Sequence, residues 1–139
     1  MERTLDMRFI RYLNLFGKIT GIRIHNCFSY NSTIFFVVPA SSVSKAIGED
    51  GRNVKKLNQI LGKKVRVIKF PKGRENMQEF ILSIIHPLKI KGLEISDDKA
   101  IINAGMQSKA ALIGRGKCRL AEMQKIVEEY FGIKELKVS

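Results

Sequence analysis

Apolar and polar residues follow one another along the first half of the chain in a pattern that predicts six elements. Leu5, Phe9 and Phe16 recur at helical spacing, so a first helix is expected to end near Gly17. The run of β-branched and aromatic residues at 33–38 predicts a strand that is buried on both faces. The expected elements are a helix at 5–17, strands at 21–28 and 33–38, a short helix ending at Ala46, a helix through Val54 and Leu57, and a strand after Gly62.

The second half repeats this order of elements. Its apolar spacing predicts a helix that Pro87 terminates, strands at 88–95 and 100–104, a short helix, a long helix ending at Phe131 and a strand at 133–138. Each half therefore has the order α-β-β-α-α-β. This order predicts an α+β protein of two domains, residues 1–70 and 71–139, which meet at Pro71-Lys72-Gly73. In each domain we expect a three-stranded sheet that helices cover on one face.

Two glycine-containing turns occupy equivalent places in the two halves. The first is Gly48-Glu49-Asp50-Gly51, between two predicted helices, and the second is Gly114-Arg115-Gly116-Lys117. The step from Gly48 to Gly114 is 66 residues, and Lys117 stands where the first copy has Gly51. Six positions match at this offset and indicate an internal duplication: Ile47 with Ile113, Gly48 with Gly114, Val54 with Leu120, Leu57 with Met123, Ile60 with Ile126, and Leu61 with Val127.

Both turns have features that suit a phosphate ligand. Glycine relaxes the backbone limits of a tight turn and, because it lacks Cβ, lets a sugar-phosphate chain approach the amides. The amino end of the following helix carries partial positive charge, which favours an anion. Arg52, Lys55 and Lys56 add positive charge after the first turn. Glu49 and Asp50 act in the opposite direction, since like charge weakens an electrostatic clamp on phosphate.

The net charge favours a polyanionic partner. The 139 residues include 25 Lys and Arg against 13 Asp and Glu, which gives a net charge of +12. A domain this basic usually binds nucleic acid, and less often an anionic membrane. The charge is uneven, at +9 over residues 1–70 and +3 over residues 71–139. A solvated basic surface with no specific partner stays open as an alternative.

Other features of the sequence argue against several protein classes. The apolar run 34–40 is about a third of a membrane span, and residues 1–6 lack the apolar core of a signal peptide. Cys27 and Cys118 form no Cys-x-x-Cys unit, which argues against a zinc site or a disulfide framework. We therefore expect a cytoplasmic protein with buried, reduced thiols, no metal, no cofactor and no membrane partner.

The motif Ile47-Gly48-x-x-Gly51-x-x-Val54, between two helices, resembles the signature of the KH domain, an RNA-binding module. The order of elements resembles the type II KH arrangement. Two such domains with almost no linker resemble the archaeal NusA-like transcription termination and elongation factors. Residues 6–10, 21–24 and 130–133 are similar to that family too, so the resemblance covers essentially the whole chain.

This resemblance implies that the chain binds single-stranded, nascent RNA, contacts RNA polymerase or its associated factors, and modulates termination or elongation of transcription. The protein is expected to be a monomer. KH domains hold about four nucleotides, with the backbone clamped by the glycine turn and the bases against an apolar groove. Carried over to this chain, the RNA-binding residues are Ile47, Gly48, Glu49, Asp50, Gly51, Arg52, Lys55 and Lys56 in the first copy and Ile113, Gly114, Arg115, Gly116, Lys117 and Arg119 in the second. Whether one or both copies bind RNA stays open, because Lys117 replaces a glycine and Glu49 and Asp50 are acidic.

Three functions other than RNA binding in transcription are alternatives for parts of this sequence. Residues 114–118 resemble the end of a P-loop, but Ala111 stands where the first glycine belongs and Cys118 where Ser or Thr must hold the metal. With no convergent acid–base set, the chain is expected not to be an enzyme. A ribosomal or ribosome-assembly KH protein and a protein-interaction module that contacts the transcription machinery remain as alternatives.

Overall fold

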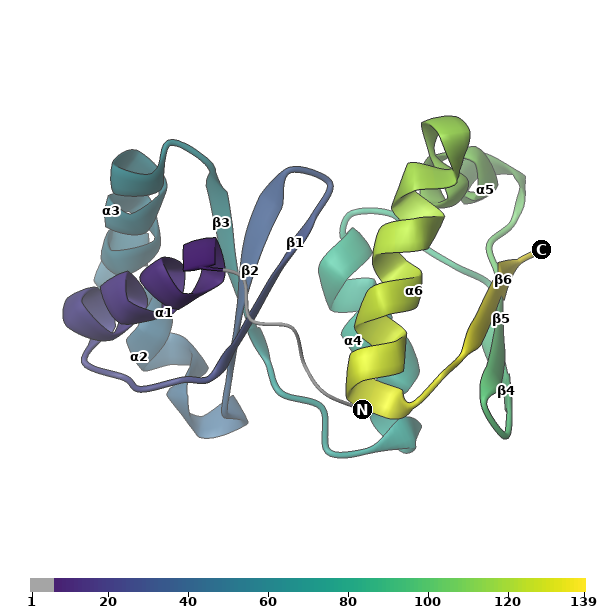
Figure 1. The fold of residues 1–139 in the computed structure, drawn as a ribbon, viewed down its shortest axis with the longest axis horizontal. Helices are drawn as coiled ribbons and strands as arrows, with labels where there is room; N and C mark the ends of the chain where they lie inside the picture. The colour runs from purple at the N-terminus through teal and green to yellow at the C-terminus, as the bar shows by residue number, and fades with distance from the viewer. Residues whose placement is uncertain (1–6) are drawn as a thin grey trace. The chain divides into compact units, whose positions relative to one another are not determined.

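The structure, a computed structural model, describes residues 7–139, which divide after Phe70 into two units (Figure 1). The first unit is Met1–Phe70 and the second is Pro71–Ser139. The part of the first predicted helix around Leu5 lies outside the described residues. Each unit contains a three-stranded sheet and helices, which confirms the predicted α+β class.

The first unit is built on a mixed sheet in the order β1-β2-β3. Strand β1 pairs with β2 in the antiparallel sense, and β3 pairs with β2 in the parallel sense. A short turn is enough to connect an antiparallel pair, whereas a parallel pair needs a longer crossover, which α2 and α3 supply here. The elements are α1 (Met7–Thr20), β1 (Asn26–Tyr30), β2 (Thr33–Val38), α2 (Val43–Ile47), α3 (Arg52–Leu61) and β3 (Lys64–Lys69).

Helices cover one face of this sheet (Figure 1). Phe16 of α1 stacks on Phe36 of β2 with the ring centroids 4.6 Å apart, and Leu57 of α3 belongs to the same buried cluster. All six residues of β2 are buried, which confirms the prediction made from its unbroken run of β-branched and aromatic residues. The helix α3 thus begins at the first glycine turn and is held against the sheet by its apolar face.

The opposite face of the same sheet is aromatic. Phe28 and Phe35 are direct partners in β1 and β2, and their rings stack at 5.2 Å. The guanidinium carbon of Arg66 lies 5.3 Å from the centroid of the Phe35 ring, within the range of a cation–π contact. Burial lowers the pKa of Arg66 from its ordinary value, because desolvation disfavours the charged form.

The second unit has the same order of elements and the same sheet topology. Its sheet has the order β4-β5-β6, in which β4 and β5 are antiparallel and β5 and β6 are parallel. Its buried core includes Phe80 and Ile81 from one helix, Ile102 from the central strand and Val127 from another helix. The elements are α4 (Met77–Ile85), β4 (Gly92–Ser96), β5 (Lys99–Asn103), α5 (Met106–Ile113), α6 (Cys118–Phe131) and β6 (Glu135–Val138).

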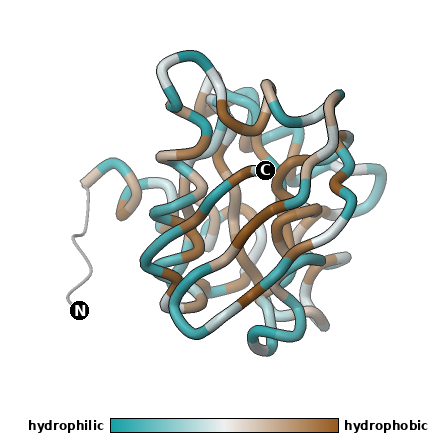
Figure 2. The backbone as a smooth tube through the Cα atoms, turned by 90° about the vertical axis from the view of Figure 1, so that its right-hand side faces the viewer, coloured by the Kyte–Doolittle hydropathy of each residue, from teal (hydrophilic) through white to brown (hydrophobic). Residues whose placement is uncertain are grey.

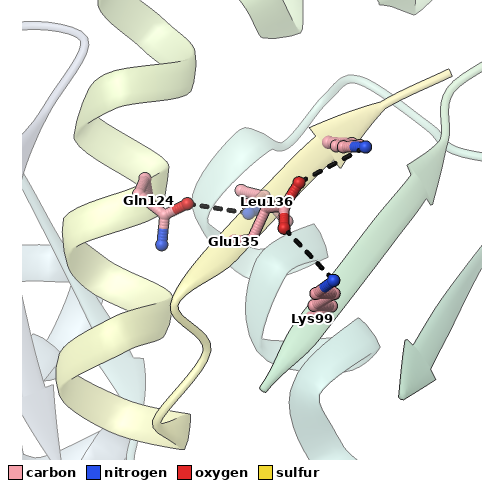
Figure 3. A network of polar contacts seen from close by, with 5 residues as sticks. Lys99, Gln124, Glu135 and Leu136 are labelled. Atoms are coloured by element: carbon pink, nitrogen blue, oxygen red, sulfur yellow. Dashed lines mark hydrogen bonds and ion pairs between the residues drawn. The ribbon is translucent and has the colours of Figure 1, made fainter. Parts of the chain in front are cut away.

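One side chain of α6, Gln124, forms a hydrogen bond with the last strand of the second unit (Figure 3). Gln124 accepts a hydrogen bond from the Leu136 amide at 2.7 Å, and its Nε2 donates to the Ile133 carbonyl oxygen at 2.9 Å. On the sheet, Glu135 forms ion pairs with Lys99 at 3.7 Å and Lys137 at 3.3 Å. Hydrophobic (brown) and hydrophilic (teal) stretches alternate along the backbone (Figure 2).

Three strands begin later than the sequence predicts. Ile24 and Ile133 are buried although neither lies in a strand, so their apolar character reflects core packing in connecting segments. Periodicity alone does not distinguish a buried residue of a strand from a buried residue of a connecting segment. The observed starts are Asn26 in place of residue 21, Gly92 in place of residue 88, and Glu135 in place of residue 133.

The first helix also extends beyond its predicted end. Gly17 does not stop α1, which continues to Thr20. The Thr20 hydroxyl donates a hydrogen bond to the Phe16 carbonyl oxygen at 2.8 Å and accepts one from the Ile22 amide at 3.1 Å. Gly21, at φ +73°, then lets the chain leave the helix.

The internal repeat holds from the first strand of each unit through the glycine turn and then shifts. Strand β1 and strand β4 are 66 residues apart, from Asn26 to Gly92. The last strands, beginning at Lys64 and Glu135, are 71 residues apart, because α6 has 14 residues where α3 has 10 and the loop after α6 is one residue longer. The predicted equivalence of Ile60 with Ile126 fails in burial, since Ile60 is 54% exposed and Ile126 is 4% exposed.

Candidate nucleic-acid interface

The first glycine turn, residues 48–51, connects α2 to α3. Gly48 has φ +83° and ψ 166°, and Asp50 and Gly51 both lie in the left-handed region, at φ +56° and +72°. The Gly48 amide donates to the Ser44 carbonyl oxygen at 3.0 Å, and the Gly51 amide donates to the Gly48 carbonyl oxygen at 3.1 Å. No side chain caps α3, so its amino end is formed by this turn alone.

The second glycine turn, residues 114–117, has the same backbone conformation between α5 and α6. Gly114 has φ +76° and ψ 170°, and Gly116 and Lys117 lie in the left-handed region at φ +61° and +62°. The matching hydrogen bonds run from Gly114 to Ala110 at 2.9 Å and from Lys117 to Gly114 at 3.1 Å. The replacement of the second motif glycine by Lys117 therefore leaves the shape of the turn unchanged.

The two turns place their second glycine at different positions. Each turn needs two consecutive residues at positive φ; the first uses Asp50 and Gly51, and the second uses Gly116 and Lys117. In each pair one residue is glycine and the other is not. Gly116 thus supplies in the second turn the backbone freedom that Gly51 supplies in the first.

The first glycine of each turn is required by the fold itself. A Cβ on Gly48 would lie 3.1 Å from the amide nitrogen of Asn53, and a Cβ on Gly114 would lie 2.9 Å from the amide nitrogen of Arg119. Both glycines also have backbone angles that only glycine adopts readily. Their presence is explained by the close approach of the following helix, whether or not a ligand binds.

The charged residues around the first turn line an open depression of about 670 Å³. Behind the turn, Asn53 Nδ2 donates to the Lys45 carbonyl oxygen at 3.2 Å and links α3 to α2. Among residues 7–139, the three basic side chains of this depression form no ion pair, so their charge is available to an anion. Its lining residues are Glu49, Asp50, Arg52, Lys55, Lys56 and Gln59, and all six are exposed.

The charges around the second turn are arranged differently. Arg115 and Lys117 are exposed and, in the part of the chain that the structure describes, form no ion pair. Arg119 donates to the Glu122 carboxylate within α6, so its positive charge is partly compensated. Cys118 at the start of α6 is exposed, contrary to the expectation of a buried thiol, whereas Cys27 is buried as expected.

The structure groups the candidate residues by unit. Those numbered 47 to 56 gather around the first turn and those numbered 113 to 119 gather around the second, as their sequence positions require. Ile47 and Ile113 are half-buried beside their turns, and Val54 packs partly into the core of the first unit. Gln59 was missed in the sequence, although its spacing of seven residues from Arg52 places the two on one face of a helix.

No group of three or more His, Cys, Asp or Glu side chains among residues 7–139 is arranged to hold a metal ion. No helix in that range combines the length and the apolar content needed to cross a bilayer.

Comparisons with known proteins give a consistent result. No protein-family model matches the chain. Three archaeal proteins named "Probable transcription termination protein NusA" are similar to it. The protein from Methanococcus vannielii is 27% identical over 99% of this chain and 80% of its own length, and that from Methanocaldococcus jannaschii is 27% identical over 93% and 71%. The protein from Halococcus morrhuae is 22% identical over the full length of both chains.

A solved structure shares the fold. The crystal structure of APE1850 superposes with a TM-score of 0.68 at 23% sequence identity, covering 97% of this chain and all of the other. Similarity at this level of identity concerns the fold alone. The three sequence relatives confirm the predicted resemblance of this chain to archaeal NusA-like proteins.

Proposed function

We propose that this protein is an RNA-binding factor of transcription, whose two units are tandem type II KH domains that bind single-stranded, nascent RNA. The main observation behind the proposal is the pair of glycine turns with one backbone conformation, each with exposed basic side chains beside it that form no ion pair among residues 7–139. The names of the three relatives, which refer to transcription termination, support the transcriptional context. Its partners would be RNA and RNA polymerase or its associated factors, and its effect a change in termination or elongation.

The manner of binding follows from the turn and its flanks. A KH domain clamps about four nucleotides by their backbone at the glycine turn and places bases in an adjacent apolar groove. Ile47 beside the first turn and Ile113 beside the second are half-buried and offer apolar surface to a base. Exposed Lys and Arg near each turn would neutralise phosphates and release counterions.

No catalytic role is proposed. The relatives are named as transcription termination proteins, and the two histidines, His25 and His86, belong to different units. Both units are instead suited to holding an extended polyanion.

The test is equilibrium binding of the full chain to a short single-stranded RNA, a duplex RNA and a single-stranded DNA, followed by fluorescence anisotropy. If four to six phosphates are engaged, affinity for the single-stranded RNA should fall by about two orders of magnitude between 50 and 200 mM salt. Weaker binding to the duplex is expected, because paired bases cannot enter the groove. A response to salt that is flat, or no RNA binding at all, would refute the proposal and favour a protein-interaction module.

A further inference from the structure

The two turns have the same shape and opposite charge. At the variable positions the first turn carries Glu49 and Asp50, whereas the second carries Arg115 and ends in Lys117. All four side chains are exposed. A phosphate that passes the first turn meets two carboxylates, and one that passes the second meets two cations.

The helices that follow the turns show the reverse distribution. The exposed face of α3 carries Arg52, Lys55, Lys56 and Gln59. The equivalent positions of α6, 66 residues later, are Cys118, Ala121, Glu122 and Lys125. Positive charge therefore lies on the helix in the first unit and on the turn in the second.

We propose that the RNA backbone contacts the two units at different elements: the α3 face in the first unit and the glycine turn in the second. This inference rests on the proposed function and assigns the phosphate contacts within it. The cations of α3 and the carboxylates of Glu49 and Asp50 line one depression, so a phosphate meets positive charge on its α3 side and negative charge on its turn side. In the second unit Arg115 and Lys117 make the turn the favoured contact.

The geometry of α3 suits a linear polyanion. Arg52 and Lys56 are four residues apart, so they follow one another by about 6 Å along the helix axis on the same face. Lys55 adds a third cation beside them, and the Gln59 amide offers a neutral donor one turn further on. A single-stranded RNA lying along this face meets three cations in succession.

The test compares three double variants of the full chain for binding to one 12-nucleotide single-stranded RNA over a series of salt concentrations. Lys55→Gln with Lys56→Gln removes charge from α3, and Arg115→Gln with Lys117→Gln removes it from the second turn. Lys18→Gln with Lys64→Gln is the matched control, because it removes the same charge from exposed positions of the first unit outside α3. Thermal unfolding followed by circular dichroism confirms that each variant is folded.

Each of the first two variants should flatten the salt slope by about 1.4 and lower affinity on the order of tenfold at 100 mM salt, the effect of two lost single-strand contacts. The control should change affinity by less than about twofold, since charges that touch no phosphate leave the slope intact. An α3 variant that behaves like the control would overturn the inference while leaving RNA binding by the wild type, and hence the proposed function, in place. Loss of RNA binding in the wild type itself would refute the proposed function instead.

A second pair of variants compares the two turns by adding a methyl group to each. Gly51→Ala and Gly116→Ala each add one methyl group at a left-handed position where no other atom lies closer than 3.9 Å. Their strain is therefore matched. Gly116→Ala should weaken RNA binding, because phosphate approaches that turn, and Gly51→Ala should not.

Equal weakening by both variants, or weakening by Gly51→Ala alone, would contradict the inference. The α3 face also fits an acidic protein surface, so the α3 variant is tested against polyglutamate in parallel. If it loses polyglutamate binding and keeps RNA binding unchanged, the α3 face serves a protein and the inference is wrong.

Discussion

The two glycine turns share their backbone and differ in nearly every side chain. Gly48 and Gly114 have φ and ψ within a few degrees of each other, and the hydrogen bonds that close the turns match one by one. The exposed charged residues are Glu49 and Asp50 in the first turn and Arg115 and Lys117 in the second, and the geometry is the same in both. Packing against the next helix thus fixes the shape of a turn, whereas the charge of the turn differs between the two copies.

The largest expected effect concerns the first glycine of each turn. Gly48→Ala and Gly114→Ala should each lower the free energy of unfolding of their unit by about 2–3 kcal/mol, because these backbone angles are strained for any side chain. The effect should be greater at Gly114, where the added Cβ also meets Arg119 Cγ at 2.7 Å. Urea unfolding measures both.

Gly51→Ala is the control for this comparison, since its Cβ meets nothing closer than 3.9 Å. It should cost about 1 kcal/mol, the ordinary penalty of a left-handed residue. If alanine lowered the free energy of unfolding equally at Gly48, Gly51 and Gly114, close packing of the following helix would not be what fixes the shape of the turns.

The two units differ in how their last helix is linked to their last strand. Gln124→Ala should destabilise the second unit by roughly 1–2 kcal/mol, because it leaves the Leu136 amide and the Ile133 carbonyl without their partner. Asn58 is the equivalent residue of α3 and is exposed, so Asn58→Ala should change stability by no more than about 0.5 kcal/mol. A stability loss that is the same in both variants, measured by urea unfolding, would mean that the side-chain bridge contributes nothing specific.

Giving the first turn the charge of the second should create a new phosphate contact. Under the proposed function, Glu49→Lys with Asp50→Lys should raise affinity for single-stranded RNA on the order of tenfold and steepen the salt slope by about 1.4. The backbone of the turn already has the required shape. Unchanged affinity would show that turn geometry and charge together do not suffice for binding.

Lys117→Gly should have the smallest effects, raising the stability of the second unit and lowering its affinity for RNA. Stability should rise by up to about 1 kcal/mol, because a non-glycine residue at φ +62° is relieved. RNA affinity should fall about fivefold at 100 mM salt with a slope flatter by about 0.7, as one phosphate contact is lost. A purely structural role for Lys117 would move stability and leave the salt slope where it is.

The sequence was most informative where apolar pattern and chain geometry agree. The strand at 33–38 has the predicted bounds, and the order of elements in both halves is the predicted one. The starts of β1, β4 and β6 were wrong because apolar residues such as Ile24 enter the core from connecting segments. The predicted match of Ile60 with Ile126 was also wrong in burial, because Ile60 is 54% exposed and Ile126 is buried.

The residues of the candidate site could be predicted from the sequence. The distribution of their charge between turn and helix could not. The glycine motif indicated both turns, but nothing in the residue type indicates that Lys117 adopts a left-handed conformation equivalent to that of Gly51. The exchange of charge between turn and helix became visible only once the exposed face of α3 was known. Gln59 belongs to that face and carries no motif of its own.

The most direct test of the central claim, that both units bind one RNA through different elements, is the salt slope of a variant that combines all four substitutions. Lys55→Gln, Lys56→Gln, Arg115→Gln and Lys117→Gln together should flatten the slope by about 2.8, the sum of the two double variants, because separate contacts release counterions independently. A combined variant whose slope is no flatter than that of either double variant alone would contradict the claim, since RNA would then be held by one unit only.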